Sequence, residues 1–351
     1  MRPGKLPPEL LARLLARLPV SDPRVIVGPR VGEDAAVIEL GDRLLVAKAD
    51  PVTFATDLIG WYTVNVNAND IAAMGAEPRW FMATALLPET LEEHEVAAIF
   101  DQVAEACRRL GVSAVGGHTE VTVGLTRPIM VGCMLGEVAR EDLVTSGGAR
   151  PGDVVILAGP IAIEGTALLA REAADRLRAR GMTAEAMARA RDLLFEPGIS
   201  VVPMARAALR VGGITALHDP TEGGLATGLM ELALASQVGL EVEAEAIPVL
   251  QLTREVCAAL GLDPLGLIAS GALLIAARAE AAGAVVEAIR ATCRAGVPFD
   301  FAQGRPTLAV APIGRILPRE EGLWLLTERG RQPLPRFERD EVARFFGEEH
   351  L

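Results

Sequence analysis

The stretch "NANDIAAMGAEP", residues 67–78, decides the fold. It places Asn67 and Asp70 three residues apart in an apolar helical segment that ends at Gly75 and Pro78. Residues three apart share a helix face. Asn and Asp are poor helix formers, because their side chains compete for backbone hydrogen bonds. A bound ligand explains that cost better than packing does, so the stretch predicts a polar binding face on an apolar helix.

Two further aspartates stand at the ends of predicted strands. "VGEDAAV" (31–37) puts Asp34 just before a strand, and "LLVAKADPVT" (44–53) puts Asp50 at the end of another. A cap is the simpler explanation for any one of these acids alone. Together with Asp70, however, three carboxylates from separate elements would repel one another unless a cation neutralised them. Hard oxygen ligands suit Mg²⁺, which predicts a metal site.

A second polar cluster is "AVGGHTEV" (114–121), where an apolar run ends in Gly116 and Gly117. The glycines permit close approach of the backbone to a ligand. His118 is open to three interpretations: a ligand, a base, or a hydrogen-bonded loop residue. Glu120 is a candidate to join the metal cluster.

The third cluster is "ALHDPTEGGLATGLMELA" (216–233). A predicted strand ends in His218 and Asp219, and Gly223 and Gly224 open a helix. Free amide groups at a helix N-terminus can hold an anion, although a glycine turn before a helix is common. His218 and Asp219 are therefore candidates for contact with a phosphate or a second substrate.

The bulk composition excludes several classes of protein. The chain has 351 residues, a net charge of −12 and a pI near 5.0, and no basic stripe of the kind that nucleic-acid binders carry. No stretch approaches about 18 uncharged apolar residues, and Arg13 and Arg17 break the apolar run near the N-terminus; we therefore expect no membrane span and no signal peptide. The four cysteines form no CxxC pair. We therefore expect a cytoplasmic protein with core thiols.

Strand and helix patterns alternate along the chain, and hairpins such as 35–40 with 43–49 argue against a purely parallel sheet. We therefore expect an α/β (α+β) protein. The Gly- and Pro-rich "TSGGARPGD" (145–153) suggests a boundary that gives domains 1–147 and 148–330 and a tail 331–351. The other elements predicted are helices 57–74, 91–110, 164–180, 184–195, 201–210, 223–237, 251–260 and 280–293, strands 80–87, 129–138, 153–158, 214–218, 240–246, 271–277, 307–316 and 322–327, and a surface loop 297–306.

Taken together, "GEDAAV", "KAD", "NANDIAAMGAEP", "VGGHTE" and "HDPTEGGLATGL" resemble, in order, the motifs of the PurM/HypE (AIR synthase-related) superfamily of ATP-dependent enzymes. The superfamily includes aminoimidazole ribonucleotide synthetase, selenophosphate synthetase, thiamine-monophosphate kinase and HypE. The resemblance covers residues 5–330. It implies a two-domain PurM-like architecture, with an N-terminal α/β domain that dimerises through its sheet and a C-terminal α/β sandwich domain.

The resemblance also implies cofactors and partners. The motif residues of this family that bind Mg²⁺ and ATP match Asn67, Asp70, Asp34 and Asp50 in this sequence. ATP, Mg²⁺, a homodimer and a small-molecule second substrate are therefore expected. "DPVTF" stands where purine-synthesis members carry a Gly- and Lys-containing stretch, and Lys48, two residues before Asp50, is the nearest cation and a candidate to bind the nucleotide.

The second half most resembles HypE, which implies a role in hydrogenase maturation with a possible maturation-protein partner. HypE proteins end in a cysteine that accepts a carbamoyl group. This sequence ends "RFFGEEHL", and its last cysteine is Cys293. His118 is a second departure, because many members carry a metal-binding acid there.

The leading hypothesis is an ATP- and Mg²⁺-dependent, HypE-like enzyme that activates a small substrate by phosphoryl transfer. One alternative is a reaction like that of thiamine-monophosphate kinase. The other is a nucleotide-binding partner protein without catalysis.

Overall fold

The computed structural model describes residues 6–53, 55, 57–295 and 309–347, and it divides the chain into two compact units. The N-terminal unit comprises Val20–Gly28 and Asp34–Leu143. The C-terminal unit comprises Pro29–Glu33, the residues from Val144 onward and the described part of the first nineteen residues. The predicted loop 297–306 lies outside the described residues, and the predicted boundary at 147/148 stays a prediction.

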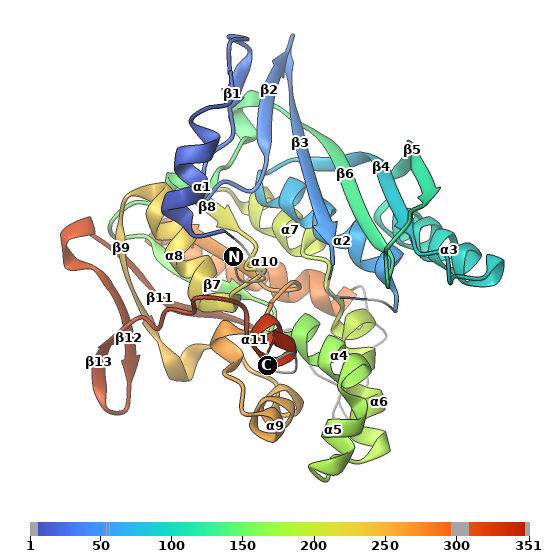
Figure 1. Ribbon diagram of the computed structural model, residues 1–351. Coiled ribbons are helices and arrows are strands. Elements are labelled where there is room, and N and C mark those ends of the chain that lie inside the picture. The colour runs from blue at the N-terminus through green and yellow to red at the C-terminus, as the bar shows by residue number, and fades with distance from the viewer. Residues whose placement is uncertain (1–5, 54, 56, 296–308, 348–351) are drawn as a thin grey trace. The chain divides into compact units, whose positions relative to one another are not determined.

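The N-terminal unit is a six-stranded sheet with two helices (Figure 1). Along the sheet the strands run in the order β1-β2-β3-β6-β4-β5. Only β4 and β5 are parallel; the other pairs are antiparallel. The elements are β1 (Val25–Val27), β2 (Ala36–Leu40), β3 (Arg43–Val52), α2 (Ile59–Ala73), β4 (Glu77–Leu87), α3 (Glu93–Leu110), β5 (Ser113–Val121), β6 (Ile129–Val138) and the short 3₁₀ turn η1 (Arg140–Asp142).

Helix α2 packs directly against the sheet because two glycines of strand β6 have no side chain that would keep it away. A Cβ atom at Gly132 would lie 2.4 Å from the Asn67 amide nitrogen, and one at Gly136 would lie 2.3 Å from Ile71. Such distances are far inside van der Waals contact, so only glycine allows the helix to approach this closely. This close approach brings the polar face of α2 against β3, the strand that carries Lys48 and Asp50.

The C-terminal unit is a seven-stranded mixed sheet, ordered β13-β12-β9-β11-β7-β10-β8, in which only β12 and β9 pair in parallel. Its strands are β7 (Val154–Ala158), β8 (Ile214–His218), β9 (Gly239–Glu243), β10 (Leu273–Ala277), β11 (Val310–Leu317), β12 (Leu323–Thr327) and β13 (Gly330–Pro333). Its helices are α1 (Pro8–Leu15), α4 (Ile163–Glu172), α5 (Ala174–Ala179), α6 (Ala184–Asp192), α7 (Val202–Val211), α8 (Gly224–Ser236), α9 (Gln251–Leu260), α10 (Ala279–Ala295) and α11 (Glu341–Gly347). Short helical turns are η2 (Ser146–Gly148), η3 (Leu194–Gly198), η4 (Ala244–Ala246), η5 (Pro264–Gly266) and η7 (Arg319–Glu321).

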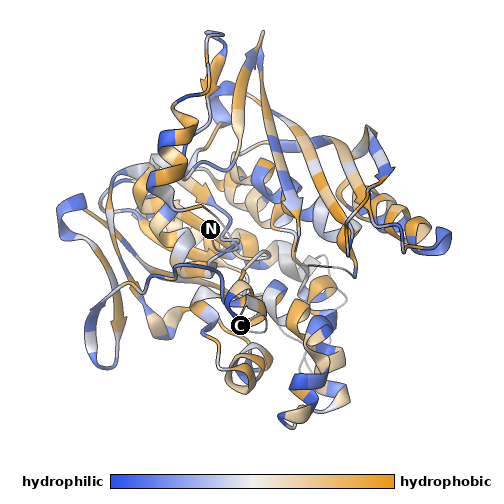
Figure 2. Cartoon of the chain, viewed as in Figure 1, coloured by the Kyte–Doolittle hydropathy of each residue, from blue (hydrophilic) through white to orange (hydrophobic). Residues whose placement is uncertain are grey.

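The core of the C-terminal unit lies around its central strands. Every residue of β10 is buried, as are four of the five in β7. Strands buried on both faces read as continuous apolar runs, as in "VVILA" of β7 and "LLIAA" of β10. Figure 2 colours the whole chain by hydropathy. Helices α7 and α10 pack against each other, α10 against β7 and β11, and α7 against β8.

The expected two-domain mixed α/β architecture is confirmed, and most predicted elements occur within a few residues of their predicted bounds. The predicted helix 164–180 is two helices, α4 and α5, broken at Ala173. Strand β5 extends through the two glycines of "AVGGHTEV", where the sequence analysis predicted only the end of an apolar run. Strands β1 and β13 and helix α11 were not predicted.

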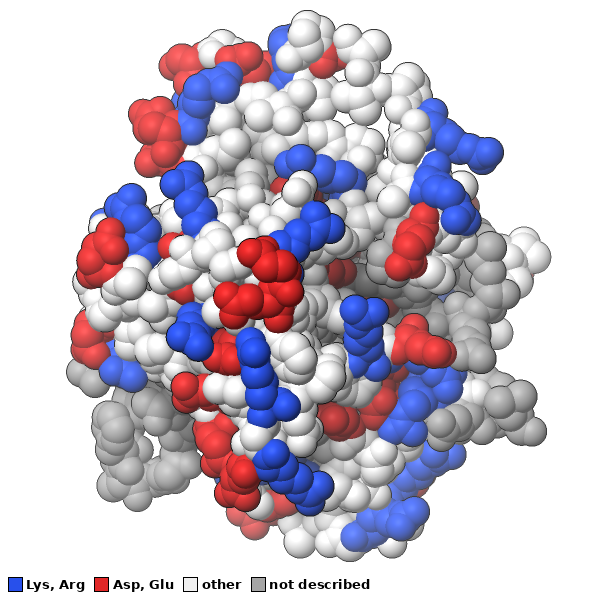
Figure 3. All heavy atoms as spheres, turned by 90° about the vertical axis from the view of Figure 1, so that its left-hand side faces the viewer, with Lys and Arg blue, Asp and Glu red and all other residues white. Residues whose placement is uncertain are grey.

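The distribution of charge on the surface agrees with the lack of a basic stripe in the sequence. On the face in Figure 3, basic and acidic side chains of the described residues are interspersed. Within the described part of the chain, no helix has both the length and the apolar character needed to cross a membrane.

Candidate functional site

The centre of the candidate site is an ion cluster between strand β3 and helix α2. Lys48 and Asp50 are two residues apart on β3, so both side chains point to the same face of the sheet. The Lys48 Nζ donates to Asp70 Oδ1 on α2 at 3.0 Å and lies 3.5 Å from Asp50 Oδ2. Two acids that the sequence predicted to converge are thus joined through a lysine.

The third predicted acid belongs to the same cluster. Asp34 lies just before β2, and one of its carboxylate oxygens is within 4.8 Å of an oxygen of Asp70. Asp34 and Asp70 are both buried, whereas the Asp50 side chain is 38% exposed. The structure therefore brings Asp34, Asp50 and Asp70 together around Lys48 within one unit.

Asn67 holds the strand end in place. Its Oδ1 accepts a hydrogen bond from the Asp50 backbone nitrogen at 2.9 Å. Its Nδ2 donates to the Asp50 carbonyl at 3.3 Å and to the Thr63 carbonyl at 2.8 Å. Both amide hydrogens thus bond to backbone carbonyls, which makes Asn67 a positioning residue for Asp50.

The electrostatics of the cluster show a shortage of positive charge. Burial alone would lower the pKa of Lys48, but the charges of Asp70, Asp50 and Asp34 outweigh it, so the pKa is raised and the ammonium persists. Burial is also the main reason that the pKa of Asp70 is raised; Lys48 opposes the rise, while Asp50 and Asp34 add to it. A group of buried carboxylates in this state gains from an additional cation.

His118 and Glu120 lie elsewhere in the N-terminal unit. They are on β5, which β6 and β4 separate from β3, a distance of roughly 14 Å at the usual strand spacing. Within one chain Glu120 therefore does not join the carboxylate cluster, contrary to the sequence-based suggestion. Both side chains are exposed, and the His118 Nε2 lies 3.1 Å from Glu120 Oε2. This bond, followed by that from Thr122, lowers the pKa of Glu120.

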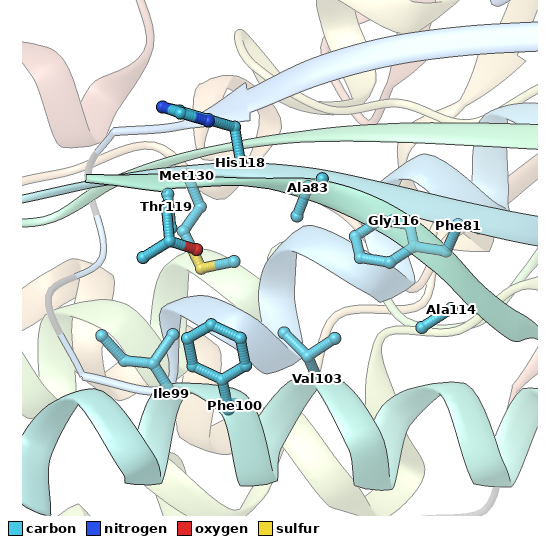
Figure 4. A pocket seen from close by; sticks show the side chains of 12 residues that line it. Phe81, Ala83, Ile99, Phe100, Val103, Ala114, Gly116, His118, Thr119 and Met130 are labelled. Carbon is cyan, nitrogen blue, oxygen red and sulfur yellow. The ribbon is translucent and has the colours of Figure 1, made fainter.

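The glycines before His118 have a structural cause. At Gly117, φ is +147° and a Cβ would lie 2.1 Å from the Ala83 carbonyl oxygen of the neighbouring strand. Gly116 and Gly117 line a cavity of about 280 Å³ between β5 and α3. Figure 4 shows Ile99, Phe100 and Val103 of α3 facing this cavity, while His118 points away from the helix.

In the C-terminal unit, the predicted anion site at the start of α8 is already filled. The Gly223 nitrogen donates to Asp340 Oδ2 at 2.7 Å, and Asp340 Oδ1 accepts from the Val342 nitrogen at 2.7 Å. Gly224 has φ +64°, and a Cβ there would lie 2.5 Å from the Leu265 carbonyl oxygen. Gly223 thus binds a carboxylate of the chain itself, and Gly224 leaves room for a neighbouring loop.

His218 is engaged in a buried network at the end of β8. Its Nε2 lies 3.2 Å from Glu231 Oε2, and its Nδ1 lies 3.4 Å from the Ser146 hydroxyl. Asp219, the next residue, is also buried. The burial and the two contacts of His218 favour a structural role over the predicted phosphate contact.

Sequence reasoning missed two buried acids, Asp340 and Glu164. Glu164 accepts a hydrogen bond from the Ser270 nitrogen at 3.2 Å. Burial raises the pKa of each to about 7, and the charge of Glu222 adds to both shifts. Glu164 could have been found from its place near the start of an apolar helical segment. Asp340 lies in a stretch that has no clear periodicity, so the sequence gave no signal for it.

Comparison with known families identifies both halves of the chain. Residues 32–138 match the model for the N-terminal domain of AIR synthase related proteins, and residues 150–297 match that for the C-terminal domain. The carbamoyl dehydratase HypE of Azotobacter vinelandii is 33% identical over 296 residues, 82% of this chain and 80% of its own length. The carbamoyl dehydratase HypE of Cupriavidus necator is 32% identical over 269 residues, 74% and 73% of the two chains.

Several solved structures share the fold of this chain. A structure of the hydrogenase maturation protein HypE in complex with ATP has a TM-score of 0.70 at 24% identity and covers 95% of this chain and 91% of its own. A HypE–HypF complex gives 0.70 at 22% identity, with 87% and 93% covered. AaThiL complexed with AMPPCP and TMP gives 0.67 at 21% identity, with 88% and 91% covered. At these identities the likeness concerns the fold alone.

Proposed function

Because the chain belongs to the AIR synthase related family, and within it to the HypE-like hydrogenase maturation proteins, we propose that it is an ATP- and Mg²⁺-dependent enzyme that activates a small substrate by phosphoryl transfer. The observation that carries the proposal is the convergence of Asp34, Asp50 and Asp70 in the N-terminal unit. The ATP complex of a HypE protein with the same fold supports the choice of nucleotide.

The donor set fits a hard divalent cation. Three carboxylates supply oxygen ligands, and the cluster is short of positive charge. Asp34, Asp50 and Asp70 would hold the ion, which supplies charge neutralisation for the phosphates of a bound nucleotide. Asn67 fixes the Asp50 backbone, so the carboxylates are placed before any ligand arrives. Phosphoryl transfer also requires a substrate oxygen that lies in line with the transferred phosphoryl group.

The substrate class follows from the relatives. Two of them are carbamoyl dehydratases, so we propose a carbamoyl-type oxygen as the acceptor. The test is ADP release from ATP and Mg²⁺ with a panel of carbamoylated thiols, run beside thiamine monophosphate. Stimulation by a carbamoylated thiol supports the assignment. Stimulation by thiamine monophosphate alone would assign the alternative kinase-like reaction, and nucleotide binding with no turnover would point to a non-catalytic partner protein.

We also propose that two copies associate through the N-terminal sheet. Strand β5 is the last strand of that sheet, and all its residues are exposed. Val115 and Val121 of β5 and Phe100 of the neighbouring helix α3 each expose more than half of their surfaces. Exposed apolar surface on a sheet edge commonly marks an interface. Light scattering tests the proposal: the Val121→Glu variant should be monomeric, and a dimer of unchanged stability would refute it.

A maturation protein is the proposed macromolecular partner. The support is a HypE–HypF complex of the same fold. Pull-down with such a protein, with and without ATP, tests the assignment.

A further inference from the structure

Lys48 reaches into the carboxylate cluster instead of toward solvent. Its Nζ is 3.0 Å from Asp70 Oδ1 and 3.5 Å from Asp50 Oδ2, and its side chain is only 20% exposed. Lysine side chains usually bury the stem and keep the ammonium in water. Here the ammonium itself stands between two acids that are candidate metal ligands.

Three carboxylates act on the same ammonium. Asp70, Asp50 and Asp34 all attract the charge of Lys48, and Asp70 also accepts its hydrogen bond. A buried ammonium is costly unless it is paired in this way. The pairing holds Lys48 on the oxygens that a divalent cation would use.

We propose that Lys48 is a fixed counter-ion that competes for the oxygens of Asp70 and Asp50 with the divalent ion that Asp34, Asp50 and Asp70 would hold. The inference deepens the proposed function, on which it rests, because it concerns the same site. The ammonium lies against Asp70 Oδ1 and Asp50 Oδ2, so these two oxygens would be unavailable to the ion while Lys48 stays in place.

Two consequences follow from a fixed counter-ion. The carboxylates stay together without metal, because Lys48 bridges them. Divalent metal alone binds weakly, because the ammonium repels it and occupies two ligand oxygens, so firm binding requires the additional oxygens of a nucleotide.

The test uses the full chain and Mn²⁺ alone, without nucleotide, titrated by electron paramagnetic resonance. Lys48→Met keeps the length of the stem and removes the charge. It should bind Mn²⁺ about tenfold more tightly or better, because a positive charge beside the ion is removed and two oxygens are freed. Lys48→Arg, the matched control, keeps the charge and should remain within about threefold of the wild type.

A second readout covers the case in which Lys48→Met folds only with metal. Its melting temperature in chelator should fall below that of the wild type and rise with Mn²⁺ more steeply. Adding Asp70→Asn to Lys48→Met should restore the melting temperature in chelator, because one carboxylate charge is removed with the ammonium, and it should abolish the gain in Mn²⁺ affinity.

The outcomes separate this inference from the function on which it rests. Wild-type binding of Mn²⁺ without tighter binding by Lys48→Met overturns the role of Lys48 and leaves the metal site intact. Failure of both proteins to bind Mn²⁺ at millimolar concentration overturns the metal site itself.

Discussion

The ion cluster on β3 and α2 and the start of helix α8 are built from the same materials, yet they treat charge in opposite ways. In the cluster, three carboxylates lie around one lysine, and the charges of Asp50 and Asp34 add to the rise in the pKa of Asp70. At the start of α8, the Gly223 amide already holds the Asp340 carboxylate. The first region gathers like charges that a further cation would stabilise, whereas the second has received its anion from the chain.

The difference teaches which kind of motif predicts a ligand. A glycine turn before a helix offers amides, and any carboxylate of the same chain can satisfy them. Several acids gathered at one place also repel one another, and backbone amides do not remove that repulsion, whereas a cation does. The acid cluster is therefore the stronger indicator of a bound ligand.

The largest effect should come from the cluster. Asp70→Asn removes a buried carboxylate from the metal site, and we expect Mg²⁺-dependent ATP affinity to fall about hundredfold or more. Asp101→Asn, an exposed change of the same charge on α3, should leave affinity unchanged. Isothermal titration measures both. Equal affinity of Asp70→Asn and wild type would mean that the cluster does not hold the metal.

The next effect should come from the start of α8. Gly224 and Gly261 have nearly the same φ, +64° and +67°, but only at Gly224 would a Cβ meet backbone atoms, within 2.5 Å of Leu265. Gly224→Ala should cost about 3 kcal/mol of unfolding free energy through strain and collision. Gly261→Ala carries the strain alone and should cost about 1 kcal/mol.

Denaturant unfolding compares the two variants. A Gly224→Ala protein as stable as Gly261→Ala would show that the loop after α9 gives way easily. The close packing at the start of α8 would then not be what excludes an external ligand.

The sequence predicted the fold better than the roles of its polar residues. The hairpin of β2 and β3 and the helix α2 follow from local apolar periods and turn residues, which act between neighbours in the chain. Strand β5 was not foreseen, because two glycines weaken the strand signal and its pairing with β4 depends on residues some thirty positions earlier.

The same distinction explains the candidate site. Convergence of the three acids was predicted from the places of Asp34 and Asp50 at strand ends and of Asp70 on a face of the helix that follows. The place of Glu120 on β5, away from the cluster, was not predicted, since the order of strands in a sheet depends on the tertiary structure. Asp340 reaches Gly223 across 117 residues, and no local pattern encodes so distant a contact.

A third prediction tests the acids of the C-terminal unit by pH. Burial raises the pKa of Glu164 from 4.5 to about 7. The native state therefore binds more protons than the unfolded state in this interval, so the contribution of Glu164 is complete below pH 4.5 and is lost as the pH rises through about 7. Glu164→Gln can still accept from Ser270 but cannot ionise. Relative to the wild type, it should gain about 2 kcal/mol between pH 5 and pH 8.

Thermal unfolding across this range measures the change. Glu185→Gln, an exposed change of the same kind on α6, should follow the wild-type curve. Glu164→Gln should keep part of the pH dependence of stability, because Asp340, whose pKa is also raised to about 7, still ionises in this variant. Parallel curves for Glu164→Gln and wild type would contradict a buried, ionising Glu164.

The smallest effect distinguishes a positioning residue from an ordinary buried amide. Asn67 and Asn65 are both buried on α2, but Asn65 donates to the Trp61 carbonyl of its own helix, whereas Asn67 bonds to the Asp50 backbone on β3. Asn67→Ala should cost about 1 kcal/mol more than Asn65→Ala, because it breaks bonds between two elements and leaves backbone groups unpaired. It should also weaken Mg²⁺-dependent ATP binding about threefold, since Asp50 is no longer held, while Asn65→Ala should not. Equal effects of the two variants on ATP binding would show that the metal site does not depend on how β3 is tied to α2.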